Sequence, residues 1–366
     1  MIKGFPFLLI DIHKCEQNIG FMVQKATKAK VYLRPHFKTH QSLAVGELFR
    51  KQGVNRITVS SVAMAEYFAA GGWSDITIAF PFLPQMAQRV NTLAQGVDLN
   101  VTFSSSHNLL ASIDKVEGRV GVFVEVDVGH GRSGVVVDNT RELALMVNLI
   151  SSKPNLIFKG FLTHAGHSYS ARSREEVEKL HTQALSKLAK LRSFWIDQFP
   201  DLTISYGDTP TCTVSDEFWG ISEIRPGNFV FYDVMQYQIG SCSTSQVAVA
   251  LICPVVDVFP GQRKLIIHGG AIHLSKDRVV IGGTDCYGFV CRFDGKRWSN
   301  PIPNAMVTSL SQEHGIITCS GNDLSDIKPG DLLAILPVHS CLTVDCIGQM
   351  YDSEGNTYDV LPKNIR

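Results

Sequence analysis

The chain has 366 residues, more than one ordinary hydrophobic core accommodates and enough for two domains. Its 34 Lys and Arg balance 34 Asp and Glu without a basic or acidic block, which argues against a surface for nucleic acid or an anionic membrane. We therefore expect small molecules as partners, with no nucleic acid and no membrane.

The N-terminus offers one short apolar run, residues 5–10, before Asp11. This run is too short and too soon charged for a signal peptide, and no stretch approaches the roughly 18 apolar residues of a membrane span. The nine cysteines are an odd number without a secretion signal, which indicates reduced thiols rather than a disulfide framework. The sequence predicts a cytoplasmic protein.

From residue 31 to residue 225, short apolar runs alternate with longer amphipathic stretches. The strand-like runs are residues 31–37, 56–60, 76–80, 98–103, 120–126, 158–164, 202–206 and 222–225. The helical patterns between them include residues 41–52, 63–70, 85–95, 142–150 and 174–194. This alternation predicts a (β/α)8 TIM-type barrel, in the α/β class. No G-x-G-x-x-G follows the first strands, which removes the usual reason to choose an open dinucleotide-binding sheet.

After residue 235 the pattern changes. Residues 236–246 are polar and rich in Ser, and they predict a linker. The apolar runs beyond it are separated by Gly, Asp and Asn turns and predict a mainly antiparallel β domain. These runs are residues 247–258, 263–268, 278–281, 306–309, 315–319 and 331–336. The expected domains are therefore 1–235, a barrel, and 236–366, a β domain.

Polar residues and glycines follow several strands of the predicted barrel, at the points where the strands end. They are Lys38 after the first strand, Asp127 and Arg132 after the fifth, His164, His167 and Tyr169 after the sixth, Gly207, Asp208 and Thr209 after the seventh, and Arg225 and Gly227 after the eighth. Chemistry in such barrels gathers at the carboxyl ends of the strands. The pattern therefore predicts one pocket built from several strands.

Lys38 is the first candidate in this pocket. A lysine that closes a buried strand must extend its ammonium group to solvent or have a partner. Desolvation lowers a lysine's pKa and makes the amine able to attack an aldehyde as a Schiff base. By position alone, a surface lysine at a strand end is the other interpretation.

The motifs around these residues resemble those of a known family. The run R-P-H-F-K-T-H at 34–40 resembles the cofactor-lysine motif of the D-threonine aldolase and eukaryotic-type D-serine dehydratase family. These are fold-type III pyridoxal-phosphate enzymes with an alanine racemase-like barrel. Four further segments are similar to family motifs, namely 125–134 (D-x-G-x-x-R-x-G), 160–169 (H-x-G-x-x-Y), 205–211 (G-[DS]-T-P) and 223–228 (R-P-G). The resemblance implies that Lys38 is the catalytic lysine that holds pyridoxal 5'-phosphate.

The resemblance also implies how the phosphate is held. Gly207, Thr209, Gly227 and Asn228 would cradle it through backbone N–H groups and a hydroxyl. Glycine permits the close backbone approach that an oxyanion needs.

Four further residues are expected around the pyridine ring. His164 would pack against the ring, and Arg132 would lie near the lysine or the phenolic oxygen. Either Tyr169 or Arg225 would face the ring nitrogen. An arginine there disfavours protonation of that nitrogen and weakens the electron sink, so the two choices differ mechanistically.

The run P-V-H-S-C at 337–341 offers a metal-ligand pair. In a strand, His339 and Cys341 would point to the same face, and imidazole plus thiolate suits Zn²⁺. On spacing alone H-x-C is a weak signal. The family carries H-x-D or H-x-C in its C-terminal domain, so the resemblance implies a metal ion beside the cofactor. Its aldolases look like H-x-D with Mn²⁺ and its dehydratases like H-x-C with Zn²⁺, in keeping with thiolate softness.

The sequence therefore predicts a pyridoxal-phosphate- and zinc-dependent dehydratase. It would convert a D-β-hydroxy amino acid such as D-serine into a 2-oxo acid and ammonia, with the D-configuration taken from the resemblance alone. One alternative is a metal-dependent D-threonine aldolase that yields glycine and an aldehyde. A noncatalytic pyridoxal-phosphate homeostasis protein is a second alternative, although such proteins resemble the barrel alone. Racemisation would need a second base that the sequence does not identify. The resemblance also implies a homodimer.

Overall fold

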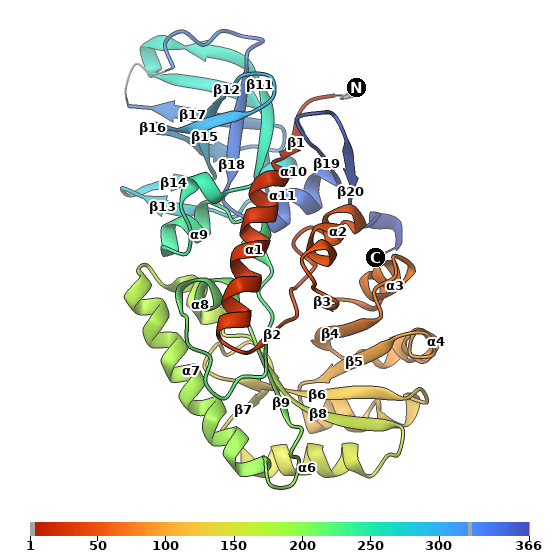
Figure 1. Ribbon diagram of the computed structural model, residues 1–366. Helices are drawn as coiled ribbons and strands as arrows, with labels where there is room; N and C mark the ends of the chain where they lie inside the picture. The colour runs from red at the N-terminus through yellow and green to blue at the C-terminus, as the bar shows by residue number, and fades with distance from the viewer. Residues whose placement is uncertain (1–3, 321–323, 366) are drawn as a thin grey trace. The chain divides into compact units, whose positions relative to one another are not determined.

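A computed structural model of the chain describes residues 4–320 and 324–365. These residues form two compact units (Figure 1). The barrel unit comprises residues 20–38, 49–227 and 364–365, and the β unit comprises residues 4–19, 39–48, 228–320 and 324–363. The domain boundary at residue 235 stays a prediction.

The barrel unit is built on a parallel sheet. Among the described residues its strand order is β2 (Tyr32–Leu33), β10 (Glu223–Ile224), β9 (Thr203–Tyr206), β8 (Leu156–Thr163), β6 (Val120–Asp127), β5 (Asp98–Phe103), β4 (Asp75–Pro81) and β3 (Arg56–Val59). A short strand, β7 (Val135–Val136), pairs with β6. A parallel bridge between His36 and Thr58 joins the two ends of this order, and Phe37 N–H donates to the Thr58 carbonyl at 2.9 Å. The predicted barrel is thereby confirmed.

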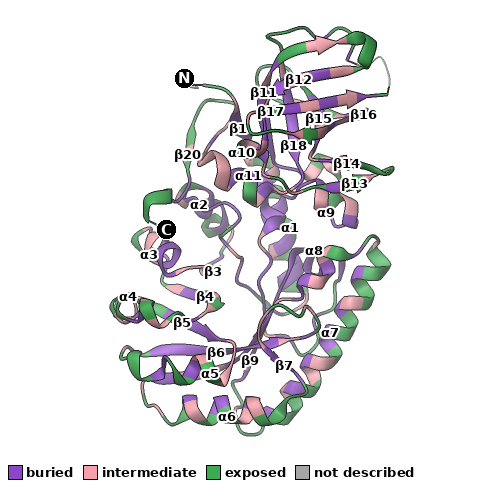
Figure 2. Cartoon of the chain, turned by 180° about the vertical axis from the view of Figure 1, so that it is seen from behind, coloured by how far each residue is buried: buried purple, intermediate pink, exposed green. Residues whose placement is uncertain are grey.

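The helices of the barrel unit follow its strands, and all of those named here except α4 begin at a side-chain cap. They are α3 (Val62–Ala70), α4 (Ala87–Leu93), α5 (Ser106–Leu110), α6 (Thr140–Ser151), α7 (Arg174–Trp195) and α8 (Thr209–Val214). Ser61, Ser105, Asn139, Ser173 and Asp208 each accept a backbone N–H of the helix that they precede. Strand β6 is buried along nearly its whole length, whereas α7 buries one side and exposes the other (Figure 2). Strands covered on both faces read as continuous apolar runs.

The β unit is built on a second, mainly antiparallel sheet. Its order is β12 (Lys264–His268), β17 (His314–Cys319), β16 (Trp298–Leu310), β15 (Gly288–Phe293), β18 (Leu332–Pro337), β11 (Val249–Phe259), β1 (Phe7–Ile10), β19 (Gln349–Tyr351) and β20 (Thr357–Asp359). An added pairing of β11 with β12 closes the first six strands into a small barrel. The strands β13 (Val279–Ile281) and β14 (Thr284–Cys286) form a separate antiparallel hairpin. The predicted antiparallel domain is confirmed, and it also takes in the N-terminal strand.

The remaining helices are short except for α1 (Ile12–Lys28). The others are α2 (Leu43–Lys51), α9 (Val234–Ile239), α10 (Ala271–Leu274) and α11 (Ser340–Ile347). Both α1 and α2 run from one unit into the other. Single 3-10 turns occupy Pro84–Met86, Ile113–Lys115, Gly166–Ser170, Asn228–Val230, Thr244–Gln246, Pro260–Gln262 and Lys363–Ile365. No helix in the described ranges is both long enough and apolar enough to cross a bilayer.

Three sequence predictions are corrected here. The segment 236–246 is not a linker, because it holds most of α9, capped by Asp233 and ended at the left-handed Gly240, and Gln236 is buried. The strand expected over 31–37 ends early, because Pro35 has no N–H to donate to the sheet. The run 337–341 is not a strand, because β18 ends at Pro337 and α11 begins at Ser340.

The buried His40 makes the stability of the β unit depend on pH. Its imidazole is fully buried and accepts the Ser42 N–H at Nδ1, at 3.1 Å. Burial lowers the pKa of His40 to about 3, so the ring is neutral in the folded protein. In the unfolded chain the ring binds a proton below about pH 6.5. Because the unfolded state binds more protons there, stability is lost as the pH falls.

We predict that His40→Gln removes part of this loss. Between pH 7 and pH 5 the wild type should lose about 2 kcal/mol more unfolding free energy than the variant. Urea unfolding at the two pH values measures the difference. Substitution of the exposed His107 by Gln serves as the control and should leave the wild-type loss unchanged. An equal loss in wild type and His40→Gln would contradict the prediction.

Candidate active site

The polar residues that the sequence places after barrel strands do follow the carboxyl ends of strands in the structure. Lys38 follows β2, Arg132 lies in the loop after β6, His164 and Tyr169 follow β8, Gly207 and Thr209 follow β9, and Arg225 and Gly227 follow β10. In a parallel barrel these ends share one rim. The expected residues of the barrel unit are thus collected at one end of it.

Electrostatics show that the cations of this set lie around two histidines. Burial, followed by the charges of Lys38 and Arg132, holds the pKa of His164 well below its usual value. Burial, Lys38 and Arg225 do the same to the pKa of His36. These five residues therefore lie near one another at the rim of the barrel unit, namely Lys38, Arg132, His164, Arg225 and His36.

Sequence reasoning missed His36 as a member of this group. Its Nδ1 accepts the backbone N–H of Lys38 at 3.3 Å, and its own N–H donates to the Pro226 carbonyl at 2.9 Å. These bonds tie the lysine segment to the turn after β10. The available signal was its position two residues before Lys38, within the R-P-H-F-K-T-H motif.

The turn after β9 has the features of an oxyanion cradle. A Cβ at Gly207 would lie 2.8 Å from the backbone nitrogen of Arg225, so this close approach requires glycine. The Gly207 carbonyl accepts a hydrogen bond from Nδ1 of His164 at 2.7 Å. Gly227 N–H donates to Oγ1 of Thr209 at 3.3 Å, and Thr209 N–H donates to the Tyr169 hydroxyl at 3.4 Å. Such long bonds leave N–H groups that a phosphate can accept from.

Asp208, which lies between these groups, supports the cradle. Its carboxylate accepts the Thr211 N–H at 2.8 Å and the Ser168 hydroxyl at 2.8 Å. Burial raises the pKa of Asp208 to about 6, although these hydrogen bonds oppose the rise. The carboxylate therefore fixes the start of α8 relative to the loop after β8.

Arg225 is anchored in the barrel wall. Its Nε donates to Oγ of Ser205 at 2.7 Å and its Nη2 donates to the Thr163 carbonyl at 2.5 Å. Burial lowers the pKa of Arg225 to about 10. Glu223 continues the network, because it accepts hydrogen bonds from Ser205 and Arg34 at 2.7 and 2.8 Å. The guanidinium direction is thus set by the wall.

Asp127, a further residue at the rim, builds the loop that carries Arg132. Its carboxylate accepts the N–H groups of Gly129, His130 and Gly131 at 2.8–3.0 Å. Burial opposes ionisation, but these three donors hold the pKa of Asp127 below its usual value. Asp127 therefore positions the loop. Arg132 is the charged residue of this loop that is proposed to act on the cofactor.

The metal motif lies in the β unit at the start of α11. His339 is the residue before the helix and Cys341 lies in its first turn, so a helix start, not a strand, brings the two side chains together. Nδ1 of His339 lies 2.7 Å from Oδ2 of Asp277. Burial opposes protonation, but the Asp277 and Cys341 side chains raise the pKa of His339 to about 11. An imidazole and a thiol near enough for one to act on the pKa of the other suit a shared metal ion.

A buried network supports this pair. Nδ2 of Asn228 donates to Oδ2 of Asp233 at 2.6 Å, to Oγ of Ser340 at 3.0 Å and to Sγ of Cys341 at 3.6 Å. The Ser340 N–H donates to the same Asp233 oxygen at 3.1 Å, and Cys341 donates to Oγ1 of Thr39 at 3.4 Å. The Asn228 side chain therefore supports the metal motif, and its backbone N–H is the part that suits a phosphate.

A second histidine cluster lies elsewhere in the β unit. His268 and His273 approach Glu313 at 3.3 and 3.9 Å, and the three groups are close enough to surround an ion. The Gly270 N–H, however, donates to Nδ1 of His273, which places the neutral ring's proton on Nε2. That nitrogen approaches Glu313 at 3.9 Å, beyond hydrogen-bond distance, whereas His268 forms a hydrogen bond with the same carboxylate at 3.3 Å. The cluster is therefore one hydrogen bond and one longer contact around a single carboxylate.

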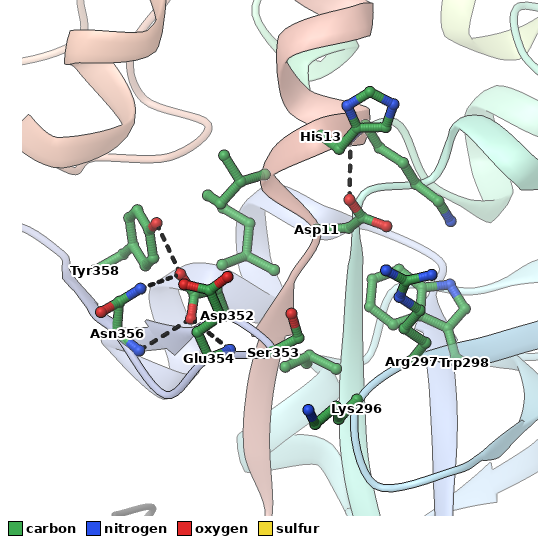
Figure 3. A pocket seen from close by; sticks show the side chains of 14 residues that line it. Asp11, His13, Lys296, Arg297, Trp298, Asp352, Ser353, Glu354, Asn356 and Tyr358 are labelled. Atoms are coloured by element: carbon green, nitrogen blue, oxygen red, sulfur yellow. Dashed lines mark hydrogen bonds between the residues drawn. The ribbon is translucent and has the colours of Figure 1, made fainter.

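A cavity of about 650 Å³ in the β unit is lined by charged side chains (Figure 3). Two of its carboxylates, those of Asp11 and Asp352, are used in local hydrogen bonds. Asp11 accepts the Lys14 N–H as the cap of α1, and Asp352 accepts hydrogen bonds from Asn356 and Tyr358. The Lys14 ammonium lies 4.6 Å from the centre of the Trp298 ring. These groups hold turns and a helix start in place.

Comparison with known proteins covers both units. Residues 10–234 match the family model described as alanine racemase, N-terminal domain, and residues 248–352 match the model described as putative serine dehydratase domain. The chain is 30% identical to the D-threo-3-hydroxyaspartate dehydratase of Delftia sp. (strain HT23), over 92% of this chain and 91% of that protein. It is 27% identical to the D-serine dehydratase of Dictyostelium discoideum, over 92% and 90% of the two chains. The D-threonine aldolase of Arthrobacter sp. is 28% identical over 62% of this chain and 61% of its own.

The solved structure of the Delftia enzyme is similar along the whole chain. The TM-score is 0.88 at 28% identity, with 98% of this chain and 97% of that chain covered. Structures of a histidine-to-alanine and a cysteine-to-alanine variant of D-threo-3-hydroxyaspartate dehydratase, at positions two residues apart, are similar as well. The cysteine variant is described as being in the metal-free form.

We predict that Gly207→Ala damages the cradle. The added Cβ must displace the backbone at Arg225, which costs about 1–3 kcal/mol of unfolding free energy and weakens pyridoxal-phosphate binding. Thermal unfolding and cofactor titration by absorbance measure the two effects. Gly96→Ala is the matched control, since a Cβ there meets no heavy atom within 4 Å. Unchanged cofactor affinity in Gly207→Ala would rule out this turn as the cradle.

Proposed function

The chain belongs to the fold-type III family that joins an alanine racemase-like barrel to a serine dehydratase domain, and on that premise we propose that it is a pyridoxal-phosphate- and zinc-dependent dehydratase. Its substrate is a D-β-hydroxy amino acid such as D-serine, and its products are a 2-oxo acid and ammonia. Two relatives matched over nine-tenths of the chain are dehydratases of D-serine and of D-threo-3-hydroxyaspartate, which supports this reaction.

The observation that carries the proposal is the pairing of His339 with Cys341. A thiolate beside an imidazole favours Zn²⁺ over the harder Mn²⁺. The metal-free cysteine variant of D-threo-3-hydroxyaspartate dehydratase supports a cysteine ligand in this family. An aldolase of the resembling type would carry Asp at position 341.

The barrel unit supplies the cofactor site. Lys38 would hold pyridoxal phosphate, whose ring accepts the electrons left on Cα when a proton is removed. The backbone of Gly207, Thr209, Gly227 and Asn228 would hold the phosphate. These N–H groups neutralise the phosphate without a bulky side chain, which leaves the mouth open to substrate.

The groups around the ring have separate tasks. His164, held by its bond to the Gly207 carbonyl, would present a fixed ring face. Arg132 would compensate negative charge at the phenolic oxygen. Tyr169 and Arg225 stay the two candidates for the ring nitrogen. Lys38, once released by the substrate, would take the Cα proton.

The β unit supplies the metal ligands. Zn²⁺ held by His339 and Cys341 would supply a Lewis acid for the substrate's β-hydroxyl, which is otherwise a poor leaving group. The chain itself connects this motif to the cofactor residues. Thr39, which accepts from Cys341, follows Lys38 directly, and Asn228, which donates to Cys341, follows Gly227.

We also propose an oligomeric state and a compartment for this enzyme. The enzyme acts as a homodimer, as the family resemblance implies, and it works in the cytoplasm. No disulfide joins its nine cysteines, all of which lie in the described residues, in keeping with a reducing compartment. A noncatalytic cofactor carrier is disfavoured by the dehydratase domain matched at 248–352.

The reaction is tested with D-threonine as substrate. We expect 2-oxobutyrate and ammonia, measured by mass spectrometry and an ammonia assay, because the β-hydroxyl leaves while the Cα–Cβ bond stays intact. Lys38→Ala should form neither product. Glycine and acetaldehyde in place of 2-oxobutyrate would establish the aldolase alternative and refute the dehydratase.

The metal site is tested by substitution of its cysteine. Cys341→Ala should lose bound zinc, measured by atomic emission after dialysis, because one of two protein ligands is removed. Cys346→Ala, five residues later and outside the proposed ligand pair, should keep it. Chelation of the wild type should abolish dehydration and leave the cofactor absorbance in place. Retention of zinc by Cys341→Ala would remove the proposed ligand pair.

A further inference from the structure

We propose that Asp277 is a positioning residue that fixes the His339 ring for metal binding, an inference that rests on the proposed zinc site. Asp277 belongs to the segment S-K-D at 275–277, to which the mechanism gives no role so far. Its Oδ2 lies 2.7 Å from Nδ1 of His339, across 62 positions of sequence. Both residues lie in the β unit.

The atoms in this contact determine which nitrogen can bind a metal. A carboxylate accepts hydrogen bonds only, so Nδ1 of His339 carries the proton. A metal can therefore bind only at Nε2, whose lone pair becomes available when the proton on that nitrogen is displaced. A carboxylate behind a metal-binding histidine also orients the ring and raises its basicity as a ligand. Asp277 therefore fixes the ring and the nitrogen through which His339 would bind the metal.

Local hydrogen bonds fix the chain on both sides of the contact between Asp277 and His339. The segment before Asp277 turns at Ser275, which has a left-handed φ of 68°, and the Asp277 N–H donates to the Ser275 hydroxyl at 3.2 Å. On the other side the Thr343 N–H donates to the His339 carbonyl at 3.2 Å. The Thr343 hydroxyl also reaches the Leu274 carbonyl at 3.5 Å, so α11 and the S-K-D turn are joined twice. A positive φ at a residue other than glycine, as at Ser275, costs energy, and the surrounding contacts hold the turn in this conformation.

The second ligand has a comparable arrangement. Sγ of Cys341 lies within hydrogen-bonding distance of the Asn228 amide and the Thr39 hydroxyl, both of which can donate to a thiolate. Asn228 is in turn held by the buried Asp233. Each ligand thus has its own supporting group, a carboxylate for the imidazole and neutral donors for the sulfur. This division fits a site built for a metal better than a plain ion pair, which would need no support for the sulfur.

The experiment measures zinc affinity directly. The dissociation constant is obtained by chelator competition for the wild type, Asp277→Asn, Asp277→Ala and Asp285→Ala. Asp285 is the matched control, because its carboxylate pairs with Arg278 at 3.1 Å and its side chain is 40% exposed, against 44% for Asp277. Thermal unfolding and cofactor absorbance are recorded for every variant as measures of folding.

We expect Asp277→Ala to weaken zinc binding by about 10–100-fold, since removal of such supporting groups has this effect. Asp277→Asn should be weakened less, because its amide oxygen can still accept the Nδ1 hydrogen. Asp285→Ala should bind zinc as the wild type does. With Co²⁺ in place of zinc, the thiolate-to-metal absorption band of Asp277→Ala should shift while that of Asp285→Ala does not.

Wild-type zinc affinity in Asp277→Ala would overturn the inference and leave the proposed function standing. An equal loss in Asp277→Ala and Asp285→Ala would also overturn it, because it would indicate a general loss of structure. Failure of the wild type itself to bind zinc would refute the proposed zinc site and the inference together.

Discussion

The candidate site depends first on the convergence of parallel strands. Because β2, β6, β8, β9 and β10 all run in one direction, the residue after each strand lies at the same rim of the barrel unit. Lys38 and Arg225 are far apart in sequence, and both act there on the pKa values of His164 and His36. Burial first, and then this positive charge, lowers the pKa of the two histidines, and the concentration of cations suits a pocket for a phosphate and an amino-acid carboxylate. The barrel is therefore both the scaffold and the source of the local field.

Asp233 provides the second constraint, within the β unit. A fully buried carboxylate is costly unless donors satisfy it, and burial raises the pKa of Asp233 despite them. Its donors come from Asn228, Gln236 and Ser340, so one carboxylate holds the start of α9 and the start of α11 to the turn after the R-P-G motif. Loss of any one of these donors would leave the buried carboxylate less fully satisfied. The metal motif is thus attached to the segment that leads out of the phosphate cradle.

Much of this arrangement was predictable from periodicity and caps. The run 98–103 matches β5, and α7 spans Arg174–Trp195 behind the cap Ser173, because apolar spacing and a capping serine are local signals. The sequence pattern does not predict α1, and it predicts a strand over 337–341, where α11 begins. Only His339 and Ser340 separate the apolar run that ends β18 from the apolar residues of the helix, and two polar residues are too short a break to mark the boundary. Residues that act through partners far along the chain, such as Asp277 and Asp233, carry no local signal at all.

Dehydration and aldol cleavage both use a metal and differ in the proton that is removed first. In both reactions a metal would stabilise negative charge on the substrate's β-oxygen, so a Lewis acid alone does not distinguish them. Dehydration begins with removal of the Cα proton, which requires a base beside Cα, whereas aldol cleavage requires a base beside the β-hydroxyl. Lys38 is tied through its backbone N–H to His36 and so to the turn after β10, next to the proposed phosphate cradle. A lysine at the cofactor's attachment point would be a base for Cα, but the lysine motif is common to the aldolases and the dehydratases that the chain resembles. The thiolate of Cys341 is therefore the feature on which the proposal of dehydration rests.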